Sequence, residues 1–120
     1  MSNQPSSFEK RPDFMSSPFR YPGNQVYALE VLLSLIPEHS VYVEPFCGGA
    51  STFFGKTKAM ENWLNDIDEE LITTYRAIRD QPEKLIAFLI KEKTSKDRHD
   101  YFKTEFRPND AVETAARWFY

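Results

Sequence analysis

The feature that most constrains the fold is a short apolar segment that ends at two adjacent glycines. Residues 40–46 (Ser-Val-Tyr-Val-Glu-Pro-Phe) are mostly β-branched or aromatic, and Gly48-Gly49 follow closely. Such residues favour strands, whereas paired glycines favour a tight turn. Residues 50–58 then suit a short helix. The segment therefore predicts a buried strand, a turn and a helix, and the glycines would let backbone N–H groups approach a ligand closely.

An acidic residue follows the next predicted strand, which covers residues 63–65. In nucleotide-binding α/β folds, an acid about 20 residues beyond the glycine turn accepts hydrogen bonds from the ribose hydroxyls. Asp66 follows Gly48 at about this spacing. Asp68 competes for the role, but it is better placed to cap the helix that begins next. The turn and Asp66 together predict half of a binding site for an adenosine-bearing cofactor.

Three other interpretations of the turn compete with this one, and the sequence argues against two of them. A nicotinamide-dinucleotide fold requires G-x-G-x-x-G, but residues 48–53 lack its second and third glycines. Gly55-Lys56-Thr57 resembles the end of the phosphate-binding motif G-x-x-x-x-G-K-T, whose first glycine would have to stand where Ala50 is. In the third interpretation, the glycines of an ordinary strand–turn–helix only reverse the chain.

Helical periodicity surrounds the two predicted strands. One helix is predicted over residues 26–36, and others follow Asp68, begin at Pro82 and begin at Asp110. The apolar faces predicted for the last three helices are Leu71, Ile72, Tyr75 and Ile78; Leu85, Ile86, Leu89 and Ile90; and Val112, Ala115, Ala116 and Phe119. Two strands are few for an α/β sheet, and the sequence ends in three aromatic residues. We therefore expect the front part of a longer α/β protein.

Composition excludes several classes of function. The 120 residues carry a net charge of −3, so overall charge gives no reason to expect nucleic-acid binding. The single cysteine, Cys47, cannot form an internal disulfide, and no Cys/His spacing suggests a metal site. The longest apolar run, residues 26–37, is too short to cross a membrane, and the polar start has no signal sequence. These observations predict a soluble cytoplasmic protein.

Several conspicuous residues favour structural interpretations. Six basic side chains could contact DNA phosphates, but interspersed acids favour a solvated surface. They are Arg76, Arg79, Lys91, Lys93, Lys96 and Arg98. His39 and His99 have no partners at catalytic spacing and are expected on the surface, while Cys47 supplies a small neutral side chain to the turn. Trp63 and the last helix's aromatic residues are expected to pack rather than stack on bases.

Three segments in order resemble the Dam-like family of DNA adenine-N6 methyltransferases. They are Phe19-Arg20-Tyr21-Pro22-Gly23-Asn24, residues 43–50 and residues 64–68, and a looser similarity extends through residues 115–120. The resemblance implies an S-adenosylmethionine-dependent enzyme that methylates the exocyclic amine of adenine in double-stranded DNA. It also implies a Rossmann-like α/β fold with a helical target-recognition insert, of which this chain holds only the first strands and helices.

The resemblance assigns domains and cofactor-binding residues. Residues 1–18 would be a loose leader, 19–80 the front of the catalytic domain, and 81–120 the start of the recognition insert. Tyr21 matches the family's aromatic position near the cofactor. Phe46, Gly48 and Ala50 match the Phe-x-Gly-x-Gly turn around the methionine moiety, and Asp66 matches the acid that holds the ribose.

The sequence departs from the family pattern in three places. Gln25 replaces a lysine whose charge could pair with the cofactor carboxylate or a catalytic-site acid, which predicts weaker cofactor binding. Ala50 replaces the last glycine of the turn, a mild change because alanine is small. The catalytic Asp-Pro-Pro-Tyr-type motif does not occur, and in the family it follows the recognition insert.

We therefore expect the catalytic residues to lie beyond residue 120 and these 120 residues alone to be inactive. The protein would come from a phage or a restriction–modification system. Two alternatives stay open: a non-catalytic remnant or cofactor-binding module without turnover, and a different S-adenosylmethionine enzyme that uses the same turn.

Overall fold

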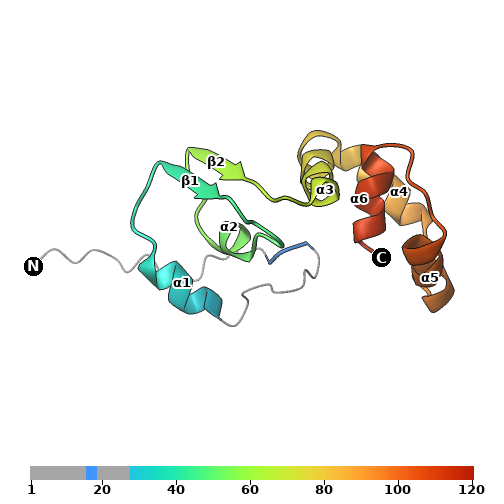
Figure 1. Cartoon of the computed structure of the whole chain (residues 1–120), viewed down its shortest axis with the longest axis horizontal. Coiled ribbons are helices and arrows are strands. Elements are labelled where there is room, and N and C mark those ends of the chain that lie inside the picture. Colours follow the sequence, from blue (N-terminus) through green and yellow to red (C-terminus); the bar gives the residue numbers. More distant parts are fainter. Residues whose placement is uncertain (1–15, 19–27) are drawn as a thin grey trace, which may run out of the picture. The chain divides into compact units, whose positions relative to one another are not determined.

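The computed structural model describes residues 16–18 and 28–120 (Figure 1). The chain divides into two compact units at the bond between Asn65 and Asp66. The predicted Pro-Gly turn lies outside the described residues, together with Tyr21 and Gln25. The N-terminal unit ends at Asn65 and the C-terminal unit covers Asp66–Tyr120; each is described by itself.

The described part of the N-terminal unit contains two helices and a sheet of two parallel strands. Its elements are α1 (Leu29–Leu35), β1 (Val41–Glu44), α2 (Ser51–Gly55) and β2 (Glu61–Leu64). The strands pair in register from Val41 opposite Glu61 to Glu44 opposite Leu64. Parallel strands cannot be joined by a tight hairpin, so the segment containing α2 carries the chain back to the start of β2. The predicted strand–turn–helix–strand order is confirmed.

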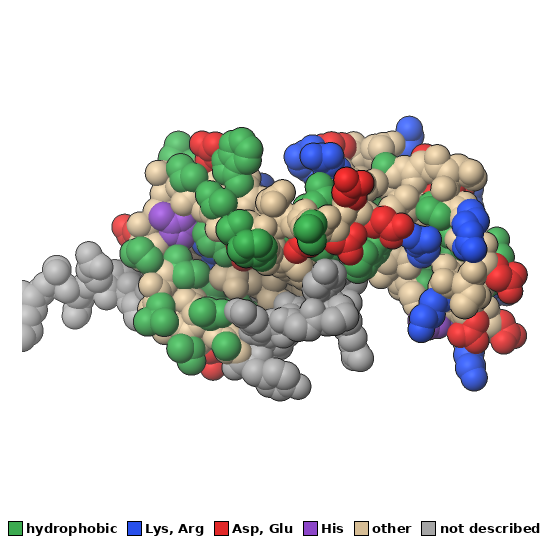
Figure 2. Space-filling view, viewed as in Figure 1, with side chains coloured by type: hydrophobic (Ala, Val, Ile, Leu, Met, Phe, Trp, Pro, Cys, Tyr) green, Lys and Arg blue, Asp and Glu red, His purple; other side chains and the backbone are tan. Residues whose placement is uncertain are grey.

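The prediction that β1 is a buried strand is wrong for one of its faces. Val41 and Val43 are 51% and 56% exposed, whereas the alternate residues Tyr42 and Glu44 are partly buried. Strand side chains alternate between the two faces of a sheet, and in the described residues α2 lies against only one of them. Hydrophobic side chains are correspondingly visible on the surface of this unit (Figure 2).

Trp63 lies on the same open face as Val43, its partner in the register. The indole is 60% exposed, and its N–H donates a hydrogen bond to Glu61 Oε1 at 2.6 Å. The expectation that Trp63 packs against the rest of the protein is therefore wrong for most of its side chain. The physical reason is again the alternation along β2, which directs Asn62 and Leu64, not Trp63, to the covered face.

The C-terminal unit is helical. Its elements are α3 (Glu69–Asp80), α4 (Pro82–Lys91), α5 (Lys96–Thr104) and α6 (Ala111–Trp118). α6 packs against both α3 and α4. The buried core consists of Ala77, Leu85, Val112, Ala115 and Ala116. The three alanines allow the helices to approach closely, so α6 fills the space that the other two helices leave.

The predicted face of α4 is partly wrong, and that of α3 is incomplete. In α3, Leu71 is fully buried as predicted, and Thr74 and Ala77 are buried beside it. Thr74 can be buried because its Oγ1 donates a hydrogen bond to the Glu70 carbonyl at 2.8 Å. In α4, Ile86 and Ile90 are exposed. Phe88 takes their place beside Leu85 and Leu89 and packs against the core. A helix rich in apolar residues all round leaves the sequence without a unique face.

The predicted helix starts are confirmed by capping hydrogen bonds. Asp68 Oδ1 accepts from the backbone N–H groups of Glu70 and Leu71 at 3.1 and 3.2 Å. Asp110 Oδ1 accepts from the Glu113 N–H at 2.8 Å, while Glu113 Oε2 accepts from the Asn109 N–H at 2.6 Å. These bonds satisfy amide groups that the first helical turn leaves without intrahelical partners.

An aromatic cluster joins α5 to the end of the chain. Phe102 is 1% exposed and lies beside Phe88, Tyr101 and Phe106. Tyr120 stacks on Phe102 with a centroid distance of 4.3 Å. The packing expected of the C-terminal aromatic residues is thus confirmed for Tyr120, while Phe119 remains 38% exposed.

None of the described helices is long and apolar enough to cross a bilayer.

Candidate functional site

The glycine turn after β1 has a defined backbone conformation. The Cys47 carbonyl accepts a hydrogen bond from the Ala50 N–H at 2.7 Å, which closes a four-residue turn. Gly48 has a φ of 48°, a region that glycine enters without steric cost. Gly49 is buried inside the turn. The turn therefore needs glycine at position 48 for its conformation, as the sequence pattern predicted.

Ala50 has a φ of 52° and a ψ of 37°, which is the left-handed helical region. This conformation brings the Cβ of an L-residue too close to the backbone and costs about 1–2 kcal/mol. The replacement of the family's glycine by Ala50 is therefore not simply a mild change in size, because it also carries a conformational cost.

Backbone hydrogen bonds tie the turn to the end of β2. The Asn65 N–H donates to the Glu44 carbonyl at 2.8 Å, and the Cys47 N–H donates to the Asn65 carbonyl at 2.8 Å. These bonds continue the parallel ladder past the last paired residues of both strands. The carboxyl ends of β1 and β2 are consequently held together, which is where ligands bind in open α/β sheets.

Phe46 presents its ring at the start of the turn. It is 90% exposed although phenylalanine is among the most apolar side chains. An exposed aromatic ring next to a glycine turn offers apolar surface to a ligand, and the absence of Cβ atoms at two positions lets that ligand reach backbone groups. The turn thus offers a ligand both apolar surface and backbone groups within reach.

Glu44 lies at the end of β1 beside the turn, and sequence reasoning gave it no role. Its carboxylate accepts a hydrogen bond from the Tyr42 hydroxyl, and Oε1 also accepts from the Phe53 N–H at 3.1 Å. Lys56 Nζ lies 4.1 Å from the centroid of the Tyr42 ring. The alternation of β1 was the available signal, since it places Tyr42 and Glu44 on one face.

Partial burial raises the pKa of the Glu44 carboxyl, and this effect exceeds the opposing effects of the hydrogen bonds from Tyr42 and Phe53 and of the Lys56 charge. Burial also raises the pKa of the Tyr42 hydroxyl, with the neighbouring Glu44 acting in the same direction. Tyr42 is therefore a neutral donor at physiological pH, and it directs its proton to Glu44.

Asp66 begins the C-terminal unit and lies just before α3. Its Oδ1 accepts a hydrogen bond from the Asp68 N–H at 3.0 Å, a turn that leads into the capped helix start. Asp68 uses its own carboxylate on α3, so the assignment of Asp68 as the cap is confirmed. The ribose role of Asp66 stays a prediction.

The lysine of the Gly55-Lys56-Thr57 sequence is in the wrong place for a phosphate loop. In that motif the Gly-Lys-Thr residues open a helix, whereas Gly55 is the last residue of α2 and Lys56 follows it. Lys56 Nζ donates to the Thr57 carbonyl at 2.6 Å. The sequence-based argument against a nucleoside-triphosphate site is therefore supported by the position of the lysine.

The two histidines and the single cysteine were the remaining candidates, and their surroundings indicate structural roles. His99 is exposed and lies 3.5 Å from Asp100, as expected of a surface residue. His39 is only partly exposed. Its Nε2 is buried without a hydrogen-bond partner, whereas its Nδ1 lies at hydrogen-bonding distance, 2.7 Å, from the Pro37 carbonyl oxygen. Its predicted surface position is thus wrong in part, because the ring packs beside Tyr42. Cys47 is buried, in agreement with a packing role.

Two of the six basic residues are engaged with acids. Arg98 pairs with Glu92 at 2.7 Å and stacks over the rings of Tyr101 and Phe102. Arg79 pairs with its neighbour Asp80 at 2.6 Å. Both contacts agree with the interpretation of this charged region as a solvated, internally paired surface.

Comparison with known proteins identifies the family. The sequence model of the D12 class N6 adenine-specific DNA methyltransferases matches residues 21–119. The type II methyltransferase M.CviBI of Paramecium bursaria Chlorella virus NC1A is 32% identical over 103 residues, which cover 84% of this chain and 40% of the viral protein. The chain belongs to the D12 class of N6 adenine-specific DNA methyltransferases, and the resemblance described above is confirmed.

Two further relatives come from bacteria and phage. The type II methyltransferase M1.LlaDCHI of Lactococcus lactis subsp. cremoris is 31% identical over 109 residues, covering 84% of this chain and 38% of the relative. The DNA N-6-adenine-methyltransferase of Escherichia phage P1 is 34% identical over 76 residues, covering 62% of this chain and 10% of the phage protein. The chain thus spans at most 40% of the length of these relatives.

Proposed function

We propose that this chain forms the S-adenosylmethionine-binding part of an enzyme that methylates adenine N6 in double-stranded DNA. The observation that carries the proposal is the turn after β1, where Phe46 is exposed and Gly48 has a positive φ. This turn lies inside the segment that matches the adenine-methyltransferase family. When bound, the cofactor supplies the methyl group, and the residues of this chain bind and orient it.

Each predicted cofactor residue has a chemical reason for its role. The Phe46 ring would contact the apolar part of the methionine moiety, and the backbone from Gly48 to Ala50 would approach its polar end. Asp66 would accept hydrogen bonds from the ribose hydroxyls. Tyr21 and Gln25 complete the proposed set on the evidence of the sequence alone, with Gln25 as a neutral replacement for lysine.

The arrangement of the polypeptide supports a broader architectural proposal. Two parallel strands joined through a helix are the repeating unit of Rossmann-like folds. We place residues 19–80 in the catalytic domain and residues 81–120 at the start of a helical target-recognition insert. DNA contact would then involve basic side chains of the second segment that remain exposed, such as Lys93 and Lys96.

Titration with S-adenosylmethionine tests the proposed site. Loss of a charge-assisted pair of hydrogen bonds to the ribose predicts that Asp66→Ala binds about 10- to 100-fold more weakly than the wild-type chain. Asp97→Ala is the matched control, because it removes an exposed aspartate from the first turn of α5. Equal affinity of the wild type and Asp66→Ala would remove Asp66 from the ribose role.

Methyl transfer tests the second part of the proposal. No Asp-Pro-Pro-Tyr-type sequence occurs in the 120 residues. We expect these residues by themselves to transfer no labelled methyl group from S-adenosylmethionine to adenine-containing duplex DNA. A duplex without adenine provides the background, and turnover above that background would contradict the expectation.

A further inference from the structure

We propose that Glu44 is a positioning residue, which holds the glycine turn in its binding conformation by fixing the start of α2 and does not itself contact the cofactor. This inference rests on the proposed function of the turn in binding S-adenosylmethionine.

Glu44 is attached to both sides of the turn. Glu44 is the last residue of β1. Its carbonyl oxygen accepts a hydrogen bond from the Asn65 N–H at 2.8 Å, which fixes its backbone in the sheet. Its side-chain Oε1 accepts a hydrogen bond from the Phe53 N–H, nine residues further along the chain, at 3.1 Å. Phe53 lies in the first turn of α2, where amide groups have no intrahelical acceptor. One side chain therefore links the residue before the turn to the helix after it.

The surroundings of the carboxylate direct it toward the protein interior. The Tyr42 hydroxyl donates to the same oxygen, Oε1, that accepts from Phe53. The Tyr42 ring lies nearly parallel to the Phe53 ring, with an interplanar angle of 22° and a centroid distance of 6.5 Å. The ammonium group of Lys56 lies over the Tyr42 ring, with Nζ 4.1 Å from the ring centroid. Residues from β1 and α2 thus enclose the carboxylate on the covered face of the sheet.

The turn requires such support because part of it is strained. Ala50, immediately before α2, has a φ of 52°, which a non-glycine residue leaves readily when its neighbours do not constrain it. The hydrogen bond between Ala50 and Cys47 closes the turn on one side. The bond from Phe53 to Glu44 prevents the first turn of α2 from rotating away on the other.

Two substitutions at position 44 separate the effect of side-chain length from the effect of side-chain charge. Glu44→Gln keeps the length of the side chain and a carbonyl oxygen that accepts from both donors, but it removes the charge. Glu44→Asp keeps the charge and shortens the side chain by one methylene, so its oxygen withdraws from the Phe53 amide by about 1.5 Å, the length of a carbon–carbon bond. Glu61→Gln is the control, since Glu61 lies exposed at the start of the neighbouring strand.

Two measurements are made on the 120-residue chain and its variants. Amide hydrogen exchange at Phe53, without cofactor, reports whether the start of α2 is held. Titration with S-adenosylmethionine reports whether the turn binds. We expect Glu44→Asp to exchange at Phe53 at least tenfold faster and to bind at least tenfold more weakly. Glu44→Gln and Glu61→Gln should stay within about threefold of the wild type in both measurements.

Three results would overturn the inference or its premise. If Glu44→Gln binds as weakly as Glu44→Asp while Phe53 stays protected, the charge of Glu44 contacts the cofactor directly. If Phe53 exchange is unchanged in Glu44→Asp, Glu44 does not hold α2. Failure of the wild-type chain to bind S-adenosylmethionine would instead refute the proposed function, whereas wild-type binding with either of the first two results refutes the role of Glu44 alone.

Discussion

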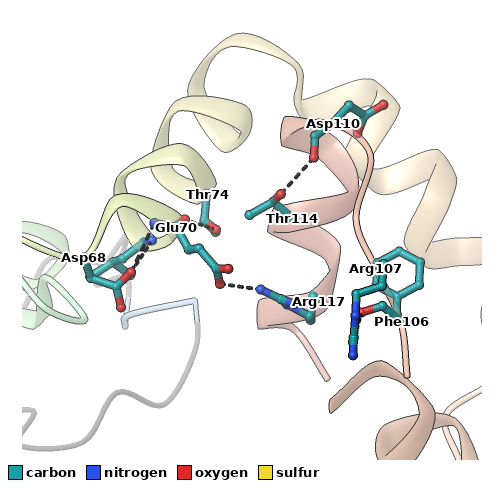
Figure 3. A network of polar contacts seen from close by, with 9 residues as sticks. Asp68, Glu70, Thr74, Phe106, Arg107, Asp110, Thr114 and Arg117 are labelled. Carbon is teal, nitrogen blue, oxygen red and sulfur yellow. Dashed lines mark hydrogen bonds and ion pairs between the residues drawn. The ribbon is translucent and has the colours of Figure 1, made fainter. Parts of the chain in front are cut away.

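Arg117 in α6 donates a hydrogen bond to the carboxylate of Glu70 in α3 (Figure 3). Glu70 lies near the first residue of the C-terminal unit and Arg117 near the last, so the bond joins parts that are far apart in the sequence. The pair lies beside the start of α3, which Asp68 caps. The Glu70 side chain is 53% exposed. The Arg117 side chain is 23% exposed, and ion pairs that are this accessible to water contribute little to stability.

We therefore predict that breaking this pair has a small effect. Arg117→Met and Glu70→Gln should each lower the free energy of unfolding by about 0.2–1 kcal/mol, and a double-mutant cycle should give a coupling energy in the same range. Urea unfolding followed by circular dichroism measures both. The sequence neighbours Arg79 and Asp80 form the control pair, because their interaction joins no two helices. A coupling above about 2 kcal/mol would contradict this view of the pair.

A larger effect is expected in the aromatic cluster of the same unit. Phe102 is almost completely buried, so Phe102→Ala should lower the free energy of unfolding by about 3–5 kcal/mol through lost contacts and the cavity that remains. Phe119→Ala removes the same side chain from a partly exposed site and should cost clearly less. Similar losses at both positions in thermal unfolding would show that Phe102 is not the centre of the cluster.

Different losses are expected for two alanine-to-glycine substitutions at buried positions. Ala50→Gly relieves the left-handed conformation, and this gain offsets the entropy that glycine adds to the unfolded chain and the loss of one buried methyl group, so stability should stay within about 1 kcal/mol of the wild type. Ala77→Gly loses a buried methyl group without such relief and introduces glycine into the middle of α3, so it should lower stability by about 2 kcal/mol. Chemical denaturation of both variants checks the difference. Equal losses at the two positions would mean that the φ of 52° is not costly.

The raised pKa of Glu44 predicts a dependence of stability on pH. The folded state holds this proton more tightly than the unfolded state, so the contribution of Glu44 to stability is complete below the ordinary carboxyl pKa. It is lost as pH rises through the folded-state value. Glu44→Gln, which cannot ionise, should therefore gain stability relative to the wild type between about pH 4 and pH 7. A difference between the two proteins that is constant with pH would exclude burial as the dominant effect on Glu44.

Local sequence patterns predicted the parts of the fold that depend on neighbours in the chain. Asp68 and Asp110 cap helices because a short acidic side chain just before a helix can accept hydrogen bonds from the N–H groups of its first turn. The order of strand, glycine turn, helix and strand was likewise predictable from residues 40–65. These features are decided by the backbone requirements of adjacent residues, which sequence expresses directly.

Features that depend on which surfaces are covered could not be predicted in the same way. Val43 and Trp63 have strand-forming side chains whether or not another element lies over them, so their exposure has no local signal. Ile86 and Phe88 are comparably apolar, and the positions of α6 and of the aromatic residues Phe102 and Phe106 decide which of them is covered. The alternation of β1 pairs Glu44 with Tyr42, but its contact with Phe53 could not be predicted, because Phe53 lies beyond the turn.

The backbone bond between Cys47 and Asn65 has a consequence for how the chain can vary in length. The turn and the end of β2 are joined through main-chain groups, which every residue except proline supplies equally well. Residues 56–60, between α2 and β2, contribute nothing to that join. Insertions there would therefore cost free energy that grows only slowly with loop length, while the carboxyl ends of both strands keep their positions.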